Sequence, residues 1–169
     1  NKKKHPFFEH AEADYFLAYR GAEAVGRIAA ILDRSHNEAH REKTAFFGLY
    51  ESQNDVETAR ALIDAAAAWG RERSMDRLRG PVNLSMNDEC ALLLEGFDAP
   101  PVVMMPYNPP YYLELMDKCG LVKAKDLYAF LKGRARKLSP RAEEFLKQLR
   151  DSKRFTFRRI SKASIQQEA

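Results

Sequence analysis

Three side chains in this sequence are of types that exchange protons in catalysis. Glu51 ends a strand-like run, and a carboxylate that is partly buried there can act as a general base. Tyr111 and Tyr112 are adjacent in a predicted helix, so they cannot share one helix face. One of them can donate a proton while the other packs. The structural alternatives stay open: a solvated glutamate at a strand end, and a core tyrosine with a hydrogen-bonded hydroxyl.

A dense polar set follows a second strand-like run and lies just after Gly80 and Pro81. Its members are Asn83, Ser85, Asn87, Asp88 and Glu89. Polar residues at the carboxyl end of a strand in an α/β sheet often line a crevice, so we expect contact with a substrate. The same residue types also build turns, and that alternative remains.

Residues 102–105 form an apolar run that contains Met104 and Met105, with Tyr107 shortly after it. Because methionine adapts to irregular apolar shapes, this run is a candidate lining for an acyl-chain channel. Ordinary core packing is the interpretation that we favour.

His36 and His40 are four residues apart, but a zinc site needs three or four ligands. Only Asp33 and Glu38 lie nearby. We therefore predict no metal site and a polar loop over residues 33–43.

The elements that must position these residues alternate between strands and helices. A β-hairpin is predicted over residues 15–32, with Gly21 in its turn. Strands are predicted at 44–51, 77–83, 127–131 and 155–160, and residues 102–107 are expected to be extended. Helices are predicted from Asp55 to Ser74, at 88–95, from Pro109 to a stop at Gly120, and after Ser139. This order predicts a mixed α/β sheet with helices on its faces.

Charge is distributed unevenly along the chain. Residues 1–122 contain 14 Lys/Arg and 19 Asp/Glu, whereas residues 123–162 contain 14 Lys/Arg and 4 Asp/Glu. Such a basic tract can meet the phosphates of a cofactor, a lipid headgroup or a nucleic acid. A solvated face is the alternative. Because few aromatic residues interleave with the basic ones, we rank nucleic-acid binding last.

The composition indicates a cytoplasmic setting. No apolar run approaches the roughly 18 residues that span a bilayer, and the two cysteines form no disulfide framework. The chain has no initiator Met, so we expect that it is a trimmed piece of a longer protein. Association with the inner membrane face stays open because of the basic tract.

The element order over residues 7–131 resembles the GNAT superfamily of acyl-CoA N-acyltransferases from its second strand onward. In that fold a short helix follows an Asn and ends at a Gly-Phe pair, positions held here by Asn108, Gly120 and Leu121. Four blocks, at 46–51, 79–89, 95–101 and 106–112, resemble more narrowly the bacterial ceramide synthase-like family, whose members carry two GNAT-like halves. The resemblance implies a GNAT-like core at 7–131, a linker and helix at 132–153, and the first strand of a second half within 154–169.

The resemblance also implies a chemistry, namely acyl transfer from acyl-CoA or acetyl-CoA to an amine such as a sphingoid base. The strands at 44–51 and 77–83 would splay apart to receive the thioester. Backbone N–H groups of Leu49 and Tyr50 would polarise its carbonyl, Glu51 would be the base, and Tyr111 or Tyr112 the acid. The remaining cofactor contacts would come from Asn54, Ala59 and Asn108.

Two departures from the GNAT pattern matter. The glycine-rich loop that cradles the CoA diphosphate at a helix N-terminus corresponds here to residues 54–59, where only Ala59 matches. Asp55 and Glu57 add negative charge where phosphates would dock. Met116 stands where many GNAT enzymes carry their acidic tyrosine.

The leading hypothesis is therefore an N-acyltransferase that uses acyl-CoA and a lipid amine. The second hypothesis is a GNAT-like half that has lost catalysis and serves as a structural or ligand-binding module. The third is binding to anionic phosphates, nucleic acid or a membrane surface through the basic tract. The sequence does not predict an oligomeric state.

Overall fold

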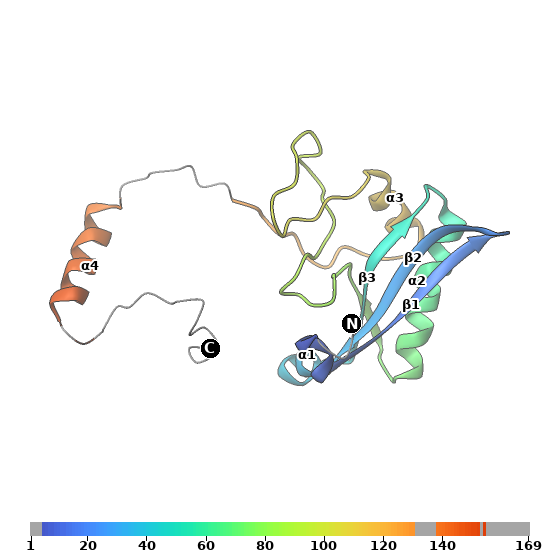
Figure 1. Ribbon diagram of the computed structural model, residues 1–169, viewed down its shortest axis with the longest axis horizontal. Coiled ribbons are helices and arrows are strands. Elements are labelled where there is room, and N and C mark those ends of the chain that lie inside the picture. Colours follow the sequence, from blue (N-terminus) through green and yellow to red (C-terminus); the bar gives the residue numbers. More distant parts are fainter. Residues whose placement is uncertain (1–4, 131–137, 153, 155–169) are drawn as a thin grey trace. The chain divides into compact units, whose positions relative to one another are not determined.

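The structure is a computed structural model that describes residues 5–130, 138–152 and 154. Internal contacts divide the chain into two units, Asn1–Leu127 and Tyr128–Ala169. The first unit contains a sheet with its covering helices (Figure 1). Within the second unit, α4 (Pro140–Asp151) is capped by Ser139, whose hydroxyl accepts a hydrogen bond from the backbone N–H of Ala142, as the sequence predicts. The strand predicted at 155–160 lies outside the described residues.

The first unit is a mixed α/β arrangement around a four-stranded sheet in the order β1-β2-β3-β4. Strands β1, β2 and β3 pair antiparallel, whereas β3 and β4 pair parallel. The elements, in chain order, are η2 (Pro6–Glu9), β1 (Ala11–Arg20), β2 (Glu23–Asp33), α1 (Arg34–His40), β3 (Thr44–Ser52), α2 (Val56–Glu72), β4 (Arg77–Arg79) and α3 (Tyr111–Lys118).

Helix α2 covers one face of the sheet (Figure 1). Its apolar residues recur at three- and four-residue steps, which places Leu62, Ile63, Ala66 and Trp69 on one buried stripe. They pack on residues of β2 and β3, including Phe47, together with the buried side of α3. A second buried cluster on the other side of the sheet contains Phe7, Ile31, Phe46 and Val82.

The pairing of β3 with β4 lasts for only three residues, from Thr44 opposite Arg77 to Phe46 opposite Arg79. The backbone N–H of Val82 then donates to the carbonyl oxygen of Phe47 at 2.8 Å. Gly48 lies where the Val82 carbonyl crosses close to β3, and a Cβ atom at Gly48 would overlap that oxygen. The next residue, Leu49, has a φ of +46°, and the β2–β3 register shifts there. A glycine inside a strand predicts either a bulge or a close approach of another backbone, and the structure has both at Gly48.

The hairpin, the strand at 44–51 and the long helix that follows it are confirmed, and each differs from the prediction by a few residues at its ends. Gly120, with a φ of +82°, directly follows the C-cap of α3, as the sequence predicts.

The loop predicted over 33–43 is wrong, because residues 34–40 form helix α1. The side chain of Asp33 caps this helix by accepting a hydrogen bond from the N–H of His36, and Arg41 ends it in a left-handed conformation. These capping interactions stabilise a helix that has no apolar stripe, so hydrophobic periodicity does not predict it.

Three further expectations fail because the backbone groups are bonded differently. Residues 88–95 form no helix, since the N–H of Ala91 donates to Pro81 and the N–H of Asn83 donates to Glu89. Residues 102–105 form an exposed turn and are neither extended nor core, and Val103 is 91% exposed. No strand forms over the described part of 127–131, because a strand needs a neighbour to accept its hydrogen bonds and none pairs there.

Replacing Gly48 with Ala is expected to destabilise the fold by about 3 kcal/mol or more, because the clash is with backbone and cannot be relieved by a rotamer change. Urea unfolding measures the loss. The control is Gly120→Ala, where a Cβ meets open space and only the left-handed φ is unfavourable, at about 1–2 kcal/mol. Equal stability of Gly48→Ala and the wild-type protein would contradict the close approach of Val82 to β3.

Candidate functional site

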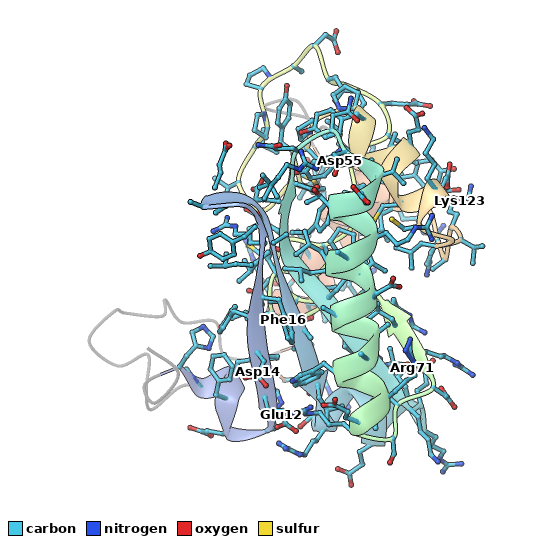
Figure 2. All side chains as sticks on the ribbon, turned by 90° about the vertical axis from the view of Figure 1, so that its right-hand side faces the viewer. Glu12, Asp14, Phe16, Asp55, Arg71 and Lys123 are labelled. Carbon is cyan, nitrogen blue, oxygen red and sulfur yellow. The ribbon has the colours of Figure 1, made fainter. Side chains whose placement is uncertain are left out.

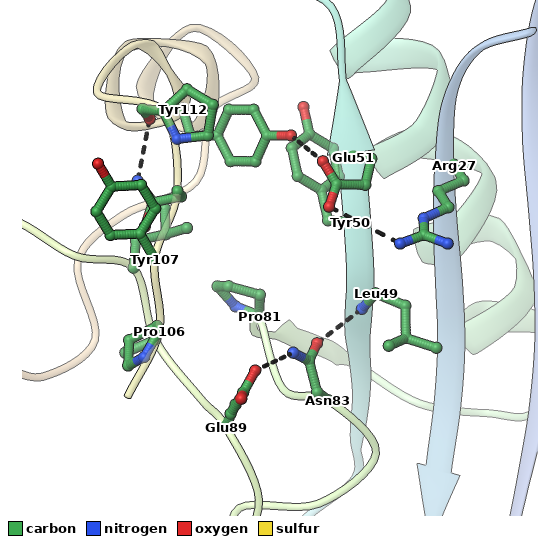
Figure 3. A pocket seen from close by; sticks show the side chains of 14 residues that line it. Arg27, Leu49, Tyr50, Glu51, Pro81, Asn83, Glu89, Pro106, Tyr107 and Tyr112 are labelled. Atoms are coloured by element: carbon green, nitrogen blue, oxygen red, sulfur yellow. Dashed lines mark hydrogen bonds and ion pairs between the residues drawn. The ribbon is translucent and has the colours of Figure 1, made fainter. Parts of the chain in front are cut away.

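A hollow of about 190 Å³ opens beside β3 at the point where β4 has ended. One wall is the end of β3, and the others come from the segment after β4 and from the approach to α3 (Figure 3). The lining residues that matter here are Leu49, Tyr50, Glu51, Asn83, Glu89, Tyr107, Asn108 and Tyr112. The strand predicted at 77–83 is too long, because β4 ends at Arg79 and residues 80–83 follow β3 only through isolated contacts, such as the bond from the Val82 N–H to the Phe47 carbonyl. The pocket lies beside β3 beyond these contacts.

Side chains replace the missing strand along this edge of β3. The N–H of Leu49 donates to Asn83 Oδ1 at 3.0 Å. The N–H of Ser52 donates to the Tyr112 hydroxyl at 3.1 Å, and the Tyr111 hydroxyl donates to the Ser52 carbonyl at 2.9 Å. Although adjacent helical residues point in different directions, both phenols of α3 thus reach the same residue of β3. These hydrogen bonds satisfy backbone groups that would otherwise need a neighbouring strand, either a longer β4 or a fifth strand.

Glu51 and Tyr112 form a direct pair at the rim of the pocket. The Tyr112 hydroxyl donates to Glu51 Oε2 at 2.9 Å, and Arg27 lies 3.8 Å from Glu51 Oε1 (Figure 3). Tyr112 is buried, whereas the Glu51 side chain is 61% exposed. The structure therefore brings together the predicted base and one of the two predicted acids. The expected partial burial of Glu51 is not found, because its carboxylate is mostly exposed and open to an incoming molecule.

Burial governs the ionisation of the two phenols nearest to Glu51. Desolvation raises the pKa of Tyr112 well above its ordinary value of 10, and the hydrogen bond to the Glu51 carboxylate adds to this shift. Burial likewise raises the pKa of Tyr50 to about 12. The Tyr50 hydroxyl has no hydrogen-bond partner among the described residues, and its ring packs edge-on against Tyr112. Both phenols therefore remain protonated near neutral pH.

The predicted polar set is divided by the structure. Asn83 lines the pocket and bridges it, since its Nδ2 donates to Glu89 at 3.2 Å. Ser85, Asn87 and Asp88 instead form an exposed turn outside the pocket lining, in which the Ser85 hydroxyl donates to Asp88 at 2.7 Å. For these three residues the turn-forming alternative describes what the structure shows.

The other predicted binding residues are also distributed unequally. Tyr107 lines the pocket, but Met104 and Met105 lie on the exposed turn and do not. Asn108 is buried and lines the pocket. Its Oδ1 accepts a hydrogen bond from the N–H of Leu93 at 2.7 Å, which ties the loop that contains Leu93 to the segment before α3.

Asn54 is exposed before α2, and Ala59 is fully buried within that helix. Neither residue lines the pocket.

The N-terminus of α2 is occupied by the carboxylate of Asp55 (Figure 2). Asp55 Oδ2 accepts hydrogen bonds from the N–H of Thr58 at 2.8 Å and from its hydroxyl at 2.6 Å, and Arg20 lies 2.9 Å away. The Thr58 bonds hold the pKa of Asp55 below its ordinary value, so the carboxylate stays charged. A carboxylate at this place, with Glu57 in the first turn, does not fit a bound diphosphate.

Two contributors to the site were missed by sequence reasoning. Ser52 acts through its backbone, which no sequence pattern reports. Arg27 lies opposite Glu51 in the β2–β3 register, so the register of the strand pairing is the signal that indicates this neighbour.

Among the described residues, no group of three or more His, Cys, Asp or Glu side chains is arranged to hold a metal ion. His36 and His40 stack against each other, with ring centroids 4.3 Å apart. In the described part of the chain, no helix combines the length and apolarity needed to cross a bilayer.

Comparison with curated proteins relates this α/β domain to two longer relatives. The chain is 40% identical over 129 residues to a protein named "Bacterial ceramide synthase" from Caulobacter vibrioides (strain NA1000 / CB15N), which covers 76% of this chain and 34% of the relative. It is 33% identical over 166 residues to "Protein YghO" from Escherichia coli (strain K12), which covers 98% of this chain and 42% of the relative. These similarities support a ceramide-synthase-like family, and the chain spans less than half of each relative. No family model and no solved structure matches the chain.

Replacing Tyr112 with Phe is expected to destabilise the protein by about 1–3 kcal/mol, because the buried N–H of Ser52 loses its acceptor. Denaturant unfolding measures the change. The matched control is Tyr107→Phe, which removes only a long, exposed hydrogen bond of 3.4 Å and should stay within about 0.5 kcal/mol of wild type. If both variants unfold at the wild-type midpoint, Tyr112 does not support the β3 edge.

The charge of Asp55 is expected to make stability depend on acid pH. Because the pKa of Asp55 is lowered on folding, its stabilising effect is complete above the unfolded value of 3.8 and is lost as pH falls through the folded value. Asp55→Asn keeps a capping oxygen without a charge, so its stability deficit at pH 7 should shrink towards pH 2. Asp55→Ala should remain less stable than Asp55→Asn throughout, because it lacks the cap. Unfolding midpoints from pH 7 to pH 2 that run parallel for all three proteins would refute this account.

Proposed function

We propose that this domain is an N-acyltransferase of the GNAT type, which moves an acyl group from a thioester to a primary amine. The observation that carries the proposal is the Glu51–Tyr112 pair at the rim of a pocket where β4 has left β3. The element order and the similarity to a protein named as a ceramide synthase support the same chemistry. A lipid amine such as a sphingoid base is the acceptor that we propose.

The proton balance gives Glu51 a defined role. Its exposed carboxylate takes one proton from the acceptor ammonium, and the freed amine nitrogen attacks the thioester carbonyl carbon. The C–N bond forms and the C–S bond breaks. Tyr112 protonates the leaving thiolate and regains a proton from the Glu51 carboxyl through their hydrogen bond. The restored Glu51 carboxylate then takes the second proton from the nitrogen and releases it to solvent. Tyr112 is the proposed acid for that thiolate, because burial keeps its hydroxyl protonated.

The proposed oxyanion contact carries a condition. The N–H of Leu49 is bonded to Asn83 Oδ1, so a substrate carbonyl must displace this side-chain oxygen to use the N–H. Asn83 is well placed to move, since its partner Glu89 is exposed.

Acyl-CoA remains the predicted donor, but no step is assigned to its diphosphate because Asp55 occupies the α2 N-terminus. That occupancy favours the second candidate, a GNAT-like module without catalysis. A cytoplasmic or peripheral membrane location, and phosphate binding by residues 123–162, stay predictions.

The direct test measures amide formation from palmitoyl thioester and a long-chain amine by mass spectrometry, in the full-length protein. Glu51→Gln is expected to lower kcat by about 10²–10⁴-fold, the usual contribution of a general base. The matched control, Glu23→Gln, changes an exposed glutamate at the start of β2, outside the pocket, and should leave kcat unchanged.

The double variant Glu51→Gln with Tyr112→Phe separates the two candidates. Turnover at the wild-type rate in that variant would assign the chemistry elsewhere and favour a non-catalytic module. Loss of turnover with retained folding, as judged by circular dichroism, supports the transferase.

A further inference from the structure

A second hollow, of about 430 Å³, lies beside the Glu51–Tyr112 pair. We call it the hairpin groove, because its floor is the end of the β1–β2 hairpin. It is lined by Leu17, Ala24, Val25, Gly26, Arg27, Glu51, Ser52, Gln53, Pro109, Tyr111 and Tyr112. Four of these residues, Arg27, Glu51, Pro109 and Tyr112, also line the first pocket. The candidate base and its phenol are thus a wall common to two hollows.

The hairpin groove is mainly apolar away from this common wall. Leu17 lies on β1 and is 57% exposed, and Ala24, Val25 and Pro109 add apolar surface. The hydroxyl of Tyr111 is bonded to the Ser52 carbonyl, which leaves the ring as the surface that an occupant would touch. A hollow of this size and lining is typical of sites that hold small apolar groups.

The charge near the end of the groove favours a cation. The only carboxylate that the described residues contribute to the groove lining is that of Glu51. The one basic neighbour in the groove lining, Arg27, is 3.8 Å from Glu51, and both side chains are more than half exposed. An ion pair of that kind is worth little, so an ammonium group can replace it at the carboxylate.

We propose that the hairpin groove holds the hydrocarbon chain of an alkylammonium acceptor whose nitrogen reaches the Glu51 carboxylate. The inference rests on the proposed function and assigns each hollow to one reactant. The thioester enters the pocket where β4 leaves β3, and the amine enters from the hairpin side. The two reactants then meet at the wall that both hollows have in common.

The test is isothermal titration of the full-length protein with n-alkylamines from hexylamine to dodecylamine, without any thioester. Complete burial of a methylene gives about a fourfold gain in affinity, so a groove that is half open should give roughly twofold per methylene. Leu17→Asn should flatten this dependence and weaken dodecylamine binding about tenfold. Ala24→Trp, which fills the groove with a bulkier side chain, should act in the same direction.

Tyr19→Asn is the matched control, because Tyr19 is an exposed apolar residue of the same strand that does not line the groove. It should bind every amine within twofold of the wild-type protein. Affinity that is independent of chain length, or equal losses in Leu17→Asn and Tyr19→Asn, would overturn the proposal.

The failure of the groove proposal can be distinguished from the failure of the transferase proposal by comparing amine binding with turnover. Chain-length-dependent binding that Leu17→Asn abolishes, in a protein that forms no amide, would retain the groove and remove the transferase. Amide formation that Leu17→Asn and Ala24→Trp leave unchanged for dodecylamine would retain the transferase and remove the groove.

Discussion

The edge of β3 beyond Gly48 is the constraint on which the rest of the domain depends. Backbone N–H and C=O groups of a strand must be bonded, and β4 pairs with β3 for only three residues. The remaining groups at Leu49 and Ser52 are bonded by the side chains of Asn83, Tyr111 and Tyr112. These side chains come from separate segments and do not fill the space that a paired strand would take. They therefore bond the backbone groups of the β3 edge and leave a hollow beside it.

This arrangement makes structure and candidate chemistry depend on the same atoms. The Tyr112 hydroxyl accepts the Ser52 N–H and donates to Glu51, so one group supports the edge and orients the carboxylate. Asn83 similarly bonds the Leu49 N–H, which is also the proposed contact for a substrate oxygen. The N-terminus of α2 is likewise satisfied from within the chain, because the Asp55 carboxylate caps the helix. A site made of such groups is stable when empty, and a substrate must compete with internal bonds to use it.

The elements that were predicted well share one property, which is that local pattern and burial agree. The stripe of α2 and the hairpin with Gly21 in its turn follow from periodicity and turn chemistry, and packing reinforces both. The errors occur where a short segment is bonded by particular partners. Helix α1 depends on the Asp33 cap and has no apolar stripe. Residues 88–95 form no helix because their backbone groups bond to Pro81 and Asn83 instead of to each other. Of the candidate site, Glu51, Tyr112 and Asn83 were named in advance, whereas Arg27 required the strand register.

The sequence by itself determined the mixed α/β order, the long helix on the sheet, an irregularity at Gly48, and the negative charge of Asp55 and Glu57 at the start of α2. These follow from residue types and spacings that act over a few positions. Only the tertiary structure decided that β4 ends after Arg79, that both tyrosines of α3 reach Ser52, and that Glu51 lies between two hollows. The physical reason is that an unpaired strand edge selects its partners by proximity in the folded chain, and the residues that meet there are some 60 positions apart.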